Sequence, residues 1–135
     1  MVCKTHRITS TLLICAIFIV SMFVCGNCFA ERKHSEKWYQ AKWCHENGGR
    51  EEAVLADRTR CDCLTNTHAI EFDFGNKWAE AIGQSLYYSL QTGKKAGIVL
   101  ILESSEDYRY WIRLNSTIKH FNLPIDTWIV RGETQ

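Results

Sequence analysis

Three carboxylates, those of Asp62, Glu71 and Asp73, have a spacing that could bring them together in one site. Glu71 and Asp73 are two residues apart in the alternating stretch His68–Phe74, so on a β-strand both side chains would lie on the same face. Nine residues separate Asp62 from Glu71, which suits two neighbouring antiparallel strands joined by a short turn. Because carboxylate oxygens are the ligands that hard divalent cations prefer, a metal site is one explanation of this spacing.

A solvated strand face is the alternative explanation of Glu71 and Asp73, because antiparallel strands commonly expose one face to water. The strand alone does not exclude this explanation. The following segment favours the metal site, since it carries polar residues at the three- and four-residue spacing of one helix face: Lys77, Glu80, Gln84 and Tyr88. A strand and a helix would then present polar side chains to the same place.

The elements that must position these residues are indicated by the pattern of apolar and turn residues. A helix is predicted over Ser35–Glu46, where aromatic and apolar residues have helical spacing and Gly48-Gly49 follows as a C-terminal cap. Three short strands are predicted to form an antiparallel meander: Glu52–Ala56, Arg60–Leu64 and Ala69–Phe74.

The rest of the pattern predicts two more helices that alternate with two strands. From an N-cap expected at Asn76, apolar residues recur every four positions: Trp78, Ile82, Leu86 and Leu90. The unbroken apolar run Gly97–Glu103 is typical of a buried strand in the middle of a sheet. A further helix ends near Phe121, and Ile125–Val130 forms the last strand. The expected fold class is α/β, with a mixed (α+β) sheet and the element order αβββαβαβ.

The first 30 residues have the pattern of a signal peptide. Lys4 and Arg7 make the start cationic, an apolar run follows over Leu12–Val24, and cleavage is expected after Ala30. The apolar run is shorter than the roughly 20 residues that a transmembrane helix needs, which favours cleavage over an uncleaved membrane anchor. We therefore expect residues 1–30 to be a signal peptide and residues 31–135 to form one exported domain, periplasmic or secreted, without stable membrane insertion.

The charge of the expected mature domain is nearly balanced. The leader holds two of the 16 Lys and Arg residues and none of the 15 acidic residues, so the domain has 14 basic and 15 acidic residues. This balance gives no bulk attraction for nucleic acid, and binding of that kind would depend on a local basic patch. The 105 residues suffice for one small hydrophobic core.

Three of the seven cysteines remain in the domain: Cys44, Cys61 and Cys63. In an oxidising compartment we expect one disulfide and one spare thiol, with Cys44 bridging to Cys61 or Cys63 and Cys63 favoured. A zinc site that also used His45 and His68 is disfavoured, because the spacing fits no common zinc-ligand pattern.

The element order and the acidic residues together resemble the PD-(D/E)xK nuclease superfamily, also called restriction-endonuclease-like. The resemblance covers about Lys37–Ile101, with Asp62 in RCDCL on the second strand and Glu71 and Asp73 in IEFDF on the third. It implies an αβββαβ core, to which this chain adds a helix and a strand at the C-terminus. The stretch GQSLYY is similar to the Gln-x-x-x-Tyr helix motif of the RecB-like branch.

This resemblance implies an Mg²⁺- or Mn²⁺-dependent nuclease that hydrolyses phosphodiester bonds of nucleic acid, with DNA as the expected substrate. It also implies that Asp62 and Glu71 are metal ligands and that the backbone carbonyl of Phe72 completes the site. Gln84 is implied to position water or phosphate, and Tyr88 to shape the substrate pocket.

The chain departs from the family pattern at Asp73, where many members have a lysine that orients the attacking water or balances charge. Two explanations are open: Asp73 takes a metal directly, or Lys77 supplies the amine from the start of the next helix. The alternative is an inactive nuclease-like module that binds nucleic acid or protein. The predicted catalytic residues are Asp62, Glu71, Asp73, Lys77 and Gln84, and the predicted substrate contacts are Lys77 and Tyr88.

Overall fold

The computed structural model describes residues 32–132. The chain divides into two units, Met1–Glu31 and Arg32–Gln135, and only the second is described below. The predicted leader and its cleavage after Ala30 lie outside the described residues.

Within residues 32–132, three α-helices and five β-strands follow in the predicted order. The elements are α2 (Glu36–Glu46), β1 (Arg50–Val54), β2 (Arg60–Leu64), β3 (His68–Phe74), α3 (Trp78–Thr92), β4 (Lys95–Leu102), α4 (Tyr108–Phe121) and β5 (Ile125–Arg131). Two 3₁₀ turns precede the second and third helices: η1 (Gly75–Lys77) and η2 (Ser105–Asp107).

The five strands form one mixed sheet in the order β1-β2-β3-β4-β5. The first three strands make the predicted antiparallel meander, whereas β3, β4 and β5 run parallel. The central strand is β3, and not β4 as the apolar run over Gly97–Glu103 indicated. The β1–β2 hairpin takes two places on one side of β3, while β4 is covered on its far side by β5 alone, so β4 is internal but off-centre.

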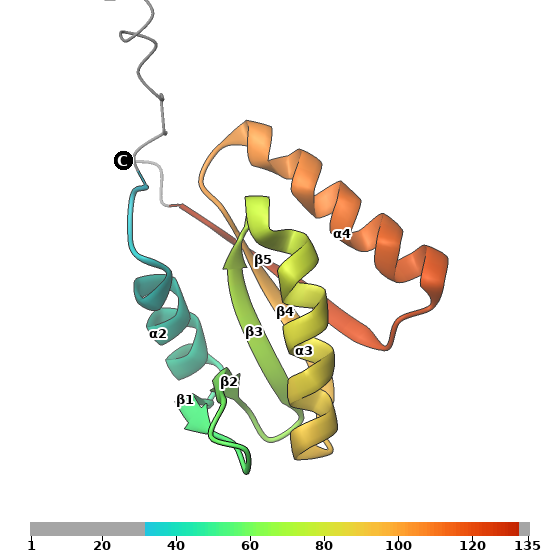
Figure 1. Cartoon of the computed structure of the whole chain (residues 1–135). Coiled ribbons are helices and arrows are strands. Elements are labelled where there is room, and N and C mark those ends of the chain that lie inside the picture. The colour runs from blue at the N-terminus through green and yellow to red at the C-terminus, as the bar shows by residue number, and fades with distance from the viewer. Residues whose placement is uncertain (1–31, 133–135) are drawn as a thin grey trace, which may run out of the picture. The chain divides into compact units, whose positions relative to one another are not determined.

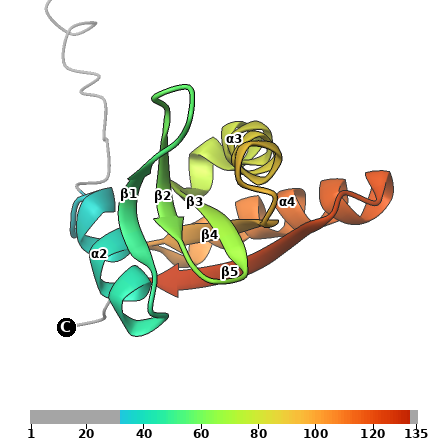
Figure 2. The ribbon, with the colours of Figure 1, turned by 90° about the horizontal axis from the view of Figure 1, so that it is seen from below.

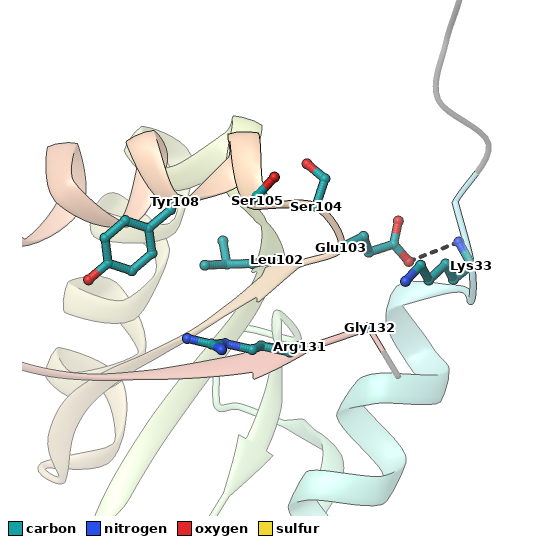
Figure 3. Close-up of a pocket in the computed structure, with 8 residues that line it drawn as sticks. All are labelled: Lys33, Leu102, Glu103, Ser104, Ser105, Tyr108, Arg131 and Gly132. Carbon is teal, nitrogen blue, oxygen red and sulfur yellow. Dashed lines mark hydrogen bonds between the residues drawn. The ribbon is translucent and has the colours of Figure 1, made fainter. Parts of the chain in front are cut away.

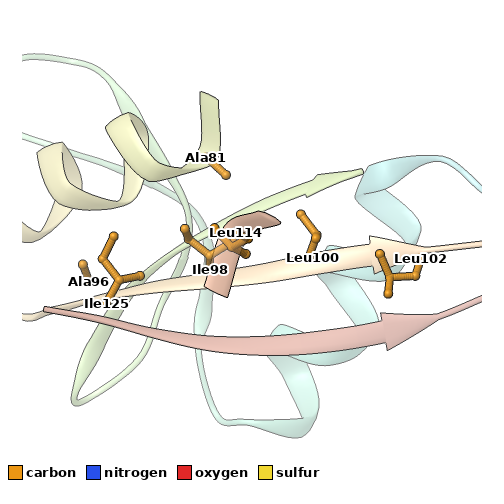
Figure 4. Packing of buried hydrophobic residues seen from close by; sticks show 7 residues of the cluster. All are labelled: Ala81, Ala96, Ile98, Leu100, Leu102, Leu114 and Ile125. Atoms are coloured by element: carbon orange, nitrogen blue, oxygen red, sulfur yellow. The ribbon is translucent and has the colours of Figure 1, made fainter. Parts of the chain in front are cut away.

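The sheet is covered by helices on both faces (Figures 1 and 2). On one face, Ala81 of α3 and Leu114 of α4 pack against Ile98 and Leu100 of β4 (Figure 4). On the other face, α2 contributes two of the residues that pack against β3: Tyr39 beside Phe74, and Cys44 beside Ile70 and Phe72. The fold is therefore a three-layer mixed α/β domain.

The alternation along β3 places its two acids beneath a helix instead of in water. Ile70, Phe72 and Phe74 pack on the α2 face. Glu71 and Asp73 point to the opposite face, and each is only 3% exposed. A solvated strand face is therefore the wrong explanation for this acidic pair.

The start and the packing of α3 differ from the prediction. Asn76 does not cap the helix, because Gly75–Lys77 form a 3₁₀ turn and α3 begins at Trp78. Leu90 does not pack and is 79% exposed. A four-residue step advances about 40° around a helix, so Leu90 lies about 120° from Trp78 and leaves the buried face. The residues of α3 that are buried are Ala81, Ser85 and Tyr88.

The disulfide joins Cys44 to Cys63, as favoured from the sequence, and Cys61 is a buried free thiol. It connects α2 to β2 across the edge of the core. Among the helices of residues 32–132, none is sufficiently long and apolar to cross a membrane.

Removing the disulfide is expected to lower the free energy of unfolding by about 3 kcal/mol, because the bond closes a loop of 19 residues and restricts the unfolded chain. The variant is Cys44→Ser with Cys63→Ser, and the measurement is urea unfolding without reductant. Cys61→Ala, which keeps the bond, is the control and should lose about 1 kcal/mol or less. Equal midpoints for the double variant and the wild type would contradict the expectation.

Candidate functional site

A gap between β2 and β3 forms the floor of the site. The two strands are paired only at Cys63–Ile70 and Leu64–Ala69. At the next position the Asp62 carboxylate replaces a backbone acceptor, since the Phe72 amide donates to Asp62 Oδ2 at 2.8 Å. The amide and the carbonyl of one strand residue point to the same side, so the Phe72 carbonyl also faces this gap.

Glu71 stands beside the gap with one of its two carboxylate oxygens unpartnered. Glu71 Oε1 accepts a hydrogen bond from Nε2 of Gln84, one turn and a half along α3. Glu71 Oε2 is buried and has no hydrogen-bond partner. Burial, and then the charge of Glu71, raises the pKa of the nearby Tyr88 hydroxyl. A buried oxygen without a partner is costly, so this side of the carboxylate is suited to a ligand.

Asp62 and Glu71 share a buried environment that disfavours two negative charges. Burial, and then the charge of Asp62, raises the pKa of Glu71 far above its ordinary value. Burial also raises the pKa of Asp62, more weakly because the Phe72 amide hydrogen-bonds to the charged form. Both shifts favour the protonated forms, so in metal-free protein the pair disfavours carrying two negative charges at once.

Asp73 and Lys77 form an ion pair at the carboxyl end of β3. Lys77 Nζ lies 3.4 Å from Asp73 Oδ1, so the lysine does turn back toward the strand. Burial raises the pKa of Asp73 to about 6, against the opposing effect of the Lys77 charge. The Asp73 charge in turn raises the pKa of Lys77, whose side chain is half-exposed. An ammonium group is thus held at the rim of the site.

The predicted residues lie around β3 in three separate contacts. Asp62 accepts from the Phe72 amide, Gln84 donates to Glu71, and Lys77 pairs with Asp73. Asp73 lies on the same face of β3 as Glu71, and its negative charge adds to the upward shift of the Glu71 pKa.

Three polar residues that the sequence did not single out also belong to this region. Gln40 of α2 is 2% exposed, and its Nε2 donates to the backbone carbonyl of Asp62 at 2.6 Å and to Glu52 Oε1 at 3.3 Å. Glu52 lies in β1 with a left-handed φ of 48°. The charge of Glu36, one turn before Gln40, raises the pKa values of both Asp62 and Glu71. The four-residue spacing of Glu36 and Gln40 was visible in the sequence, but the direction of that helix face was not.

The residues present fit a hard divalent cation bound by few protein ligands. No group of three or more His, Cys, Asp and Glu side chains suited to a metal occurs within residues 32–132. The set here consists of two carboxylates and one carbonyl, all oxygen donors, and one oxygen is buried without a partner. Mg²⁺ commonly binds through one or two carboxylates and keeps several waters, so a small protein ligand set is sufficient.

Comparison with known proteins gives no match, since no family model, curated protein or solved structure matches this chain. The chemistry of the site must therefore be inferred from its own residues.

Replacing Glu71 with Gln is expected to stabilise the metal-free protein at pH 8, by on the order of 2 kcal/mol, and to give no such gain at pH 4. The pKa of Glu71 is raised on folding from an ordinary value of 4.5. The folded state then binds more protons than the unfolded state as pH rises above about 4.5, and the stability of the wild type falls through that range. Urea unfolding in EDTA at both pH values measures the difference.

The control for this prediction is Glu80→Gln, which removes an exposed carboxylate from the same segment of chain. Its effect on stability should be small at both pH values. A Glu71→Gln protein whose stability follows the same pH dependence as the wild type would contradict the buried, protonated Glu71.

Proposed function

We propose that the protein is an exported, metal-dependent nuclease of the PD-(D/E)xK type that hydrolyses nucleic-acid phosphodiester bonds, with DNA as the expected substrate. The observation that carries the proposal is the pairing of the half-buried Asp62 with the buried Glu71, whose Oε2 has no partner. A site that holds two acids out of water at a cost in stability is suited to binding a cation. The mixed sheet and the element order agree with the restriction-endonuclease-like core that the sequence resembles.

Asp62, Glu71 and the Phe72 carbonyl would hold Mg²⁺ or Mn²⁺. A bound ion of this kind neutralises phosphate charge and lowers the pKa of a bound water. The protein's own contribution is to fix the ligands: the Phe72 amide orients Asp62, and Gln84 orients Glu71 through Oε1. Tyr88 is buried beside Ala53, Cys61 and Ala69, and the nearby charge of Glu71 adds to the upward shift of its pKa.

Lys77 supplies the cation that the family usually carries at the position of Asp73. Asp73 holds the Lys77 ammonium by an ion pair at the carboxyl end of β3, where the amine can contact a substrate phosphate. Asp73 is then a positioning residue for Lys77, or an additional metal ligand once Lys77 has moved to the phosphate.

Export is part of the proposal, because a disulfide such as Cys44–Cys63 persists in oxidising compartments and is rare in the reducing cytosol. The leader pattern of residues 1–30 agrees with export to the periplasm or the medium. An uncleaved leader that anchors the domain is the alternative.

An inactive module that binds nucleic acid or protein is the second candidate function. The observation that favours it is the same Lys77–Asp73 pair, in which the Lys77 ammonium is already engaged by a carboxylate. Metal binding or oligonucleotide binding without turnover would support this candidate.

Asp62→Asn and Glu71→Gln should each lower kcat/KM for Mg²⁺-dependent DNA cleavage by about 100-fold or more, because each removes a metal ligand. The measurement is cleavage of single-stranded DNA, double-stranded DNA and RNA, with Mg²⁺, with Mn²⁺ and with EDTA. Glu80→Gln is the matched control and should keep wild-type activity. Wild-type rates for both site variants would exclude the nuclease proposal, as would a folded wild type that cleaves none of these substrates.

Lys77→Gln should lower kcat by about 100-fold, because it removes a cation that stabilises the charged transition state. Lys77→Arg should retain part of the activity, and Lys95→Gln, an exposed lysine at the start of β4, should retain all of it. If Asp73→Asn abolishes cleavage while Lys77→Gln does not, then Asp73 acts as a metal ligand and the assignment of Lys77 is wrong.

A further inference from the structure

A cavity of about 490 Å³ lies at the carboxyl ends of the parallel strands β4 and β5, and none of the acidic-site residues lines it. Leu102 ends β4, Arg131 ends β5, and Tyr108 begins α4 above them (Figure 3). In Figure 3 the Leu102 side chain lies between the Tyr108 ring and the Arg131 side chain. Volumes of this size hold small organic ligands, and ligands of α/β proteins commonly bind at the carboxyl ends of parallel strands.

The cavity joins an aromatic ring, an apolar floor and a cation. Tyr108 is 47% exposed, although it is a large aromatic residue, and Leu102 is almost fully buried beside it. Arg131 is exposed, and within residues 32–132 its guanidinium forms no ion pair. A planar base can stack on a tyrosine ring, and a guanidinium can bind a phosphate through two parallel hydrogen bonds.

Among the described residues that line the cavity, the acid is Glu103, and its carboxylate is already engaged. Glu103 Oε1 accepts from the Lys33 amide at 2.9 Å, from the Tyr39 hydroxyl at 2.8 Å and from the His34 amide at 3.3 Å. The first of these bonds is drawn in Figure 3. Glu103 therefore links the segment before α2 to the end of β4. Its negative charge is stabilised by these hydrogen-bond donors.

The cavity and the acidic site lie at the same edge of the sheet. Strands β3, β4 and β5 are parallel, and Phe74 is in register with Ile101, and Leu102 with Arg131. Gly75, next to Phe74, is where the two regions meet: a Cβ there would lie 3.2 Å from Leu102 Cδ2 and 2.9 Å from the Tyr110 ring. Glu71 is in register with Ile98 and Thr127, so Arg131 lies two strand spacings across, about 10 Å, and four residues along the strands, about 13 Å, a distance that a short single strand of nucleic acid can span.

We propose that this cavity is a nucleotide subsite, which binds one nucleotide of a single-stranded substrate with its base on Tyr108 and its phosphate on Arg131. The assignment rests on the proposed function for the identity of the ligand. The assignment also specifies the substrate class, which is single-stranded nucleic acid. The substrate would run along the carboxyl edge of β3, β4 and β5, from the acids to this cavity. A duplex end must then be opened, or be single-stranded already, before its nucleotide enters the cavity.

Fluorescence anisotropy with a labelled oligothymidylate of about eight nucleotides tests the assignment, on the intact protein in EDTA so that no cleavage occurs. Tyr108→Ala should weaken binding roughly tenfold, with an unchanged dependence on salt, and Tyr108→Phe should bind as the wild type does. Arg131→Gln should weaken binding and should reduce the slope of log Kd against log salt by about 0.7, the value for one lost phosphate contact on a single strand.

Matched controls come from the far end of α4, where Phe121 and Lys119 are an exposed aromatic residue and an exposed cation. Phe121→Ala and Lys119→Gln should change neither affinity nor salt slope. Equal losses for Arg131→Gln and Lys119→Gln would show a diffuse surface attraction and would overturn the assignment. So would an absence of oligonucleotide binding by the wild type, or unchanged binding by both cavity variants with wild-type unfolding midpoints.

Cleavage assays in Mg²⁺ separate this assignment from the nuclease proposal. If the wild type binds through Tyr108 and Arg131 but does not cut, the nuclease proposal fails and the subsite stands. If it cuts single strands and neither cavity variant raises KM, the subsite fails and the nuclease proposal stands. If both hold, the cavity variants raise KM for single strands by about tenfold and leave kcat close to the wild-type value.

Discussion

The hydrogen bond from the Phe72 amide to the Asp62 carboxylate is the contact on which the acidic site depends. A strand amide in a sheet normally donates to a neighbouring carbonyl, and a buried amide that lacks an acceptor is costly. Here a side chain takes the place of that carbonyl, so β2 can separate from β3 without leaving an amide unsatisfied. The separation opens the gap that Glu71 faces, and the same bond holds the Asp62 oxygens at its edge. The hydrogen bond between the Phe72 amide and Asp62 therefore accounts both for the gap between β2 and β3 and for the position of the Asp62 carboxylate beside it.

The acids are held in place by their surroundings and not by favourable electrostatics among themselves. Asp62, Glu71 and Asp73 all have raised pKa values, chiefly from burial, which means that the fold keeps them close at some cost. The free-energy cost of burying the acids is offset on the other face of β3, where its apolar side chains pack against α2. A strand with one apolar face and one acidic face can be fully buried only between two helices, and this protein supplies both.

The element order and the shared face of Glu71 and Asp73 followed from local pattern, because strand alternation and turn residues act over a few positions. The sequence favoured Cys63 over Cys61 as the partner of Cys44 but did not decide between them. What the pattern missed depends on how whole elements pack. The exposure of Leu90 reflects the drift of a four-residue repeat around a helix. The central place of β3 reflects where the hairpin and β5 add to the sheet.

Some residues of the site could be predicted from the local sequence pattern, and others are brought to it only by the packing of whole elements. Asp62, Gln84 and Lys77 could be predicted because strand pairing, helical spacing and the family resemblance all act over short stretches of sequence on either side of Glu71. Gln40 and Glu36 could not, since their approach to the acids is set by the rotation of α2 against the sheet. The unpartnered oxygen of Glu71 is likewise a property of packing alone.

Gln40 and Cys44 are one helical turn apart on α2, and their partners, the Asp62 carbonyl and Cys63, are neighbours on β2. The disulfide and the hydrogen bond thus link the same helix to the same strand at adjacent positions. In a reduced chain the Cys44–Cys63 bond is absent, and β2, which carries Asp62, is then linked to α2 by the hydrogen bond of Gln40 without the covalent bond. Under the proposed function of an exported nuclease, assembly of the acidic site would follow oxidation, and the producing cell's own DNA would be spared until the protein had been exported.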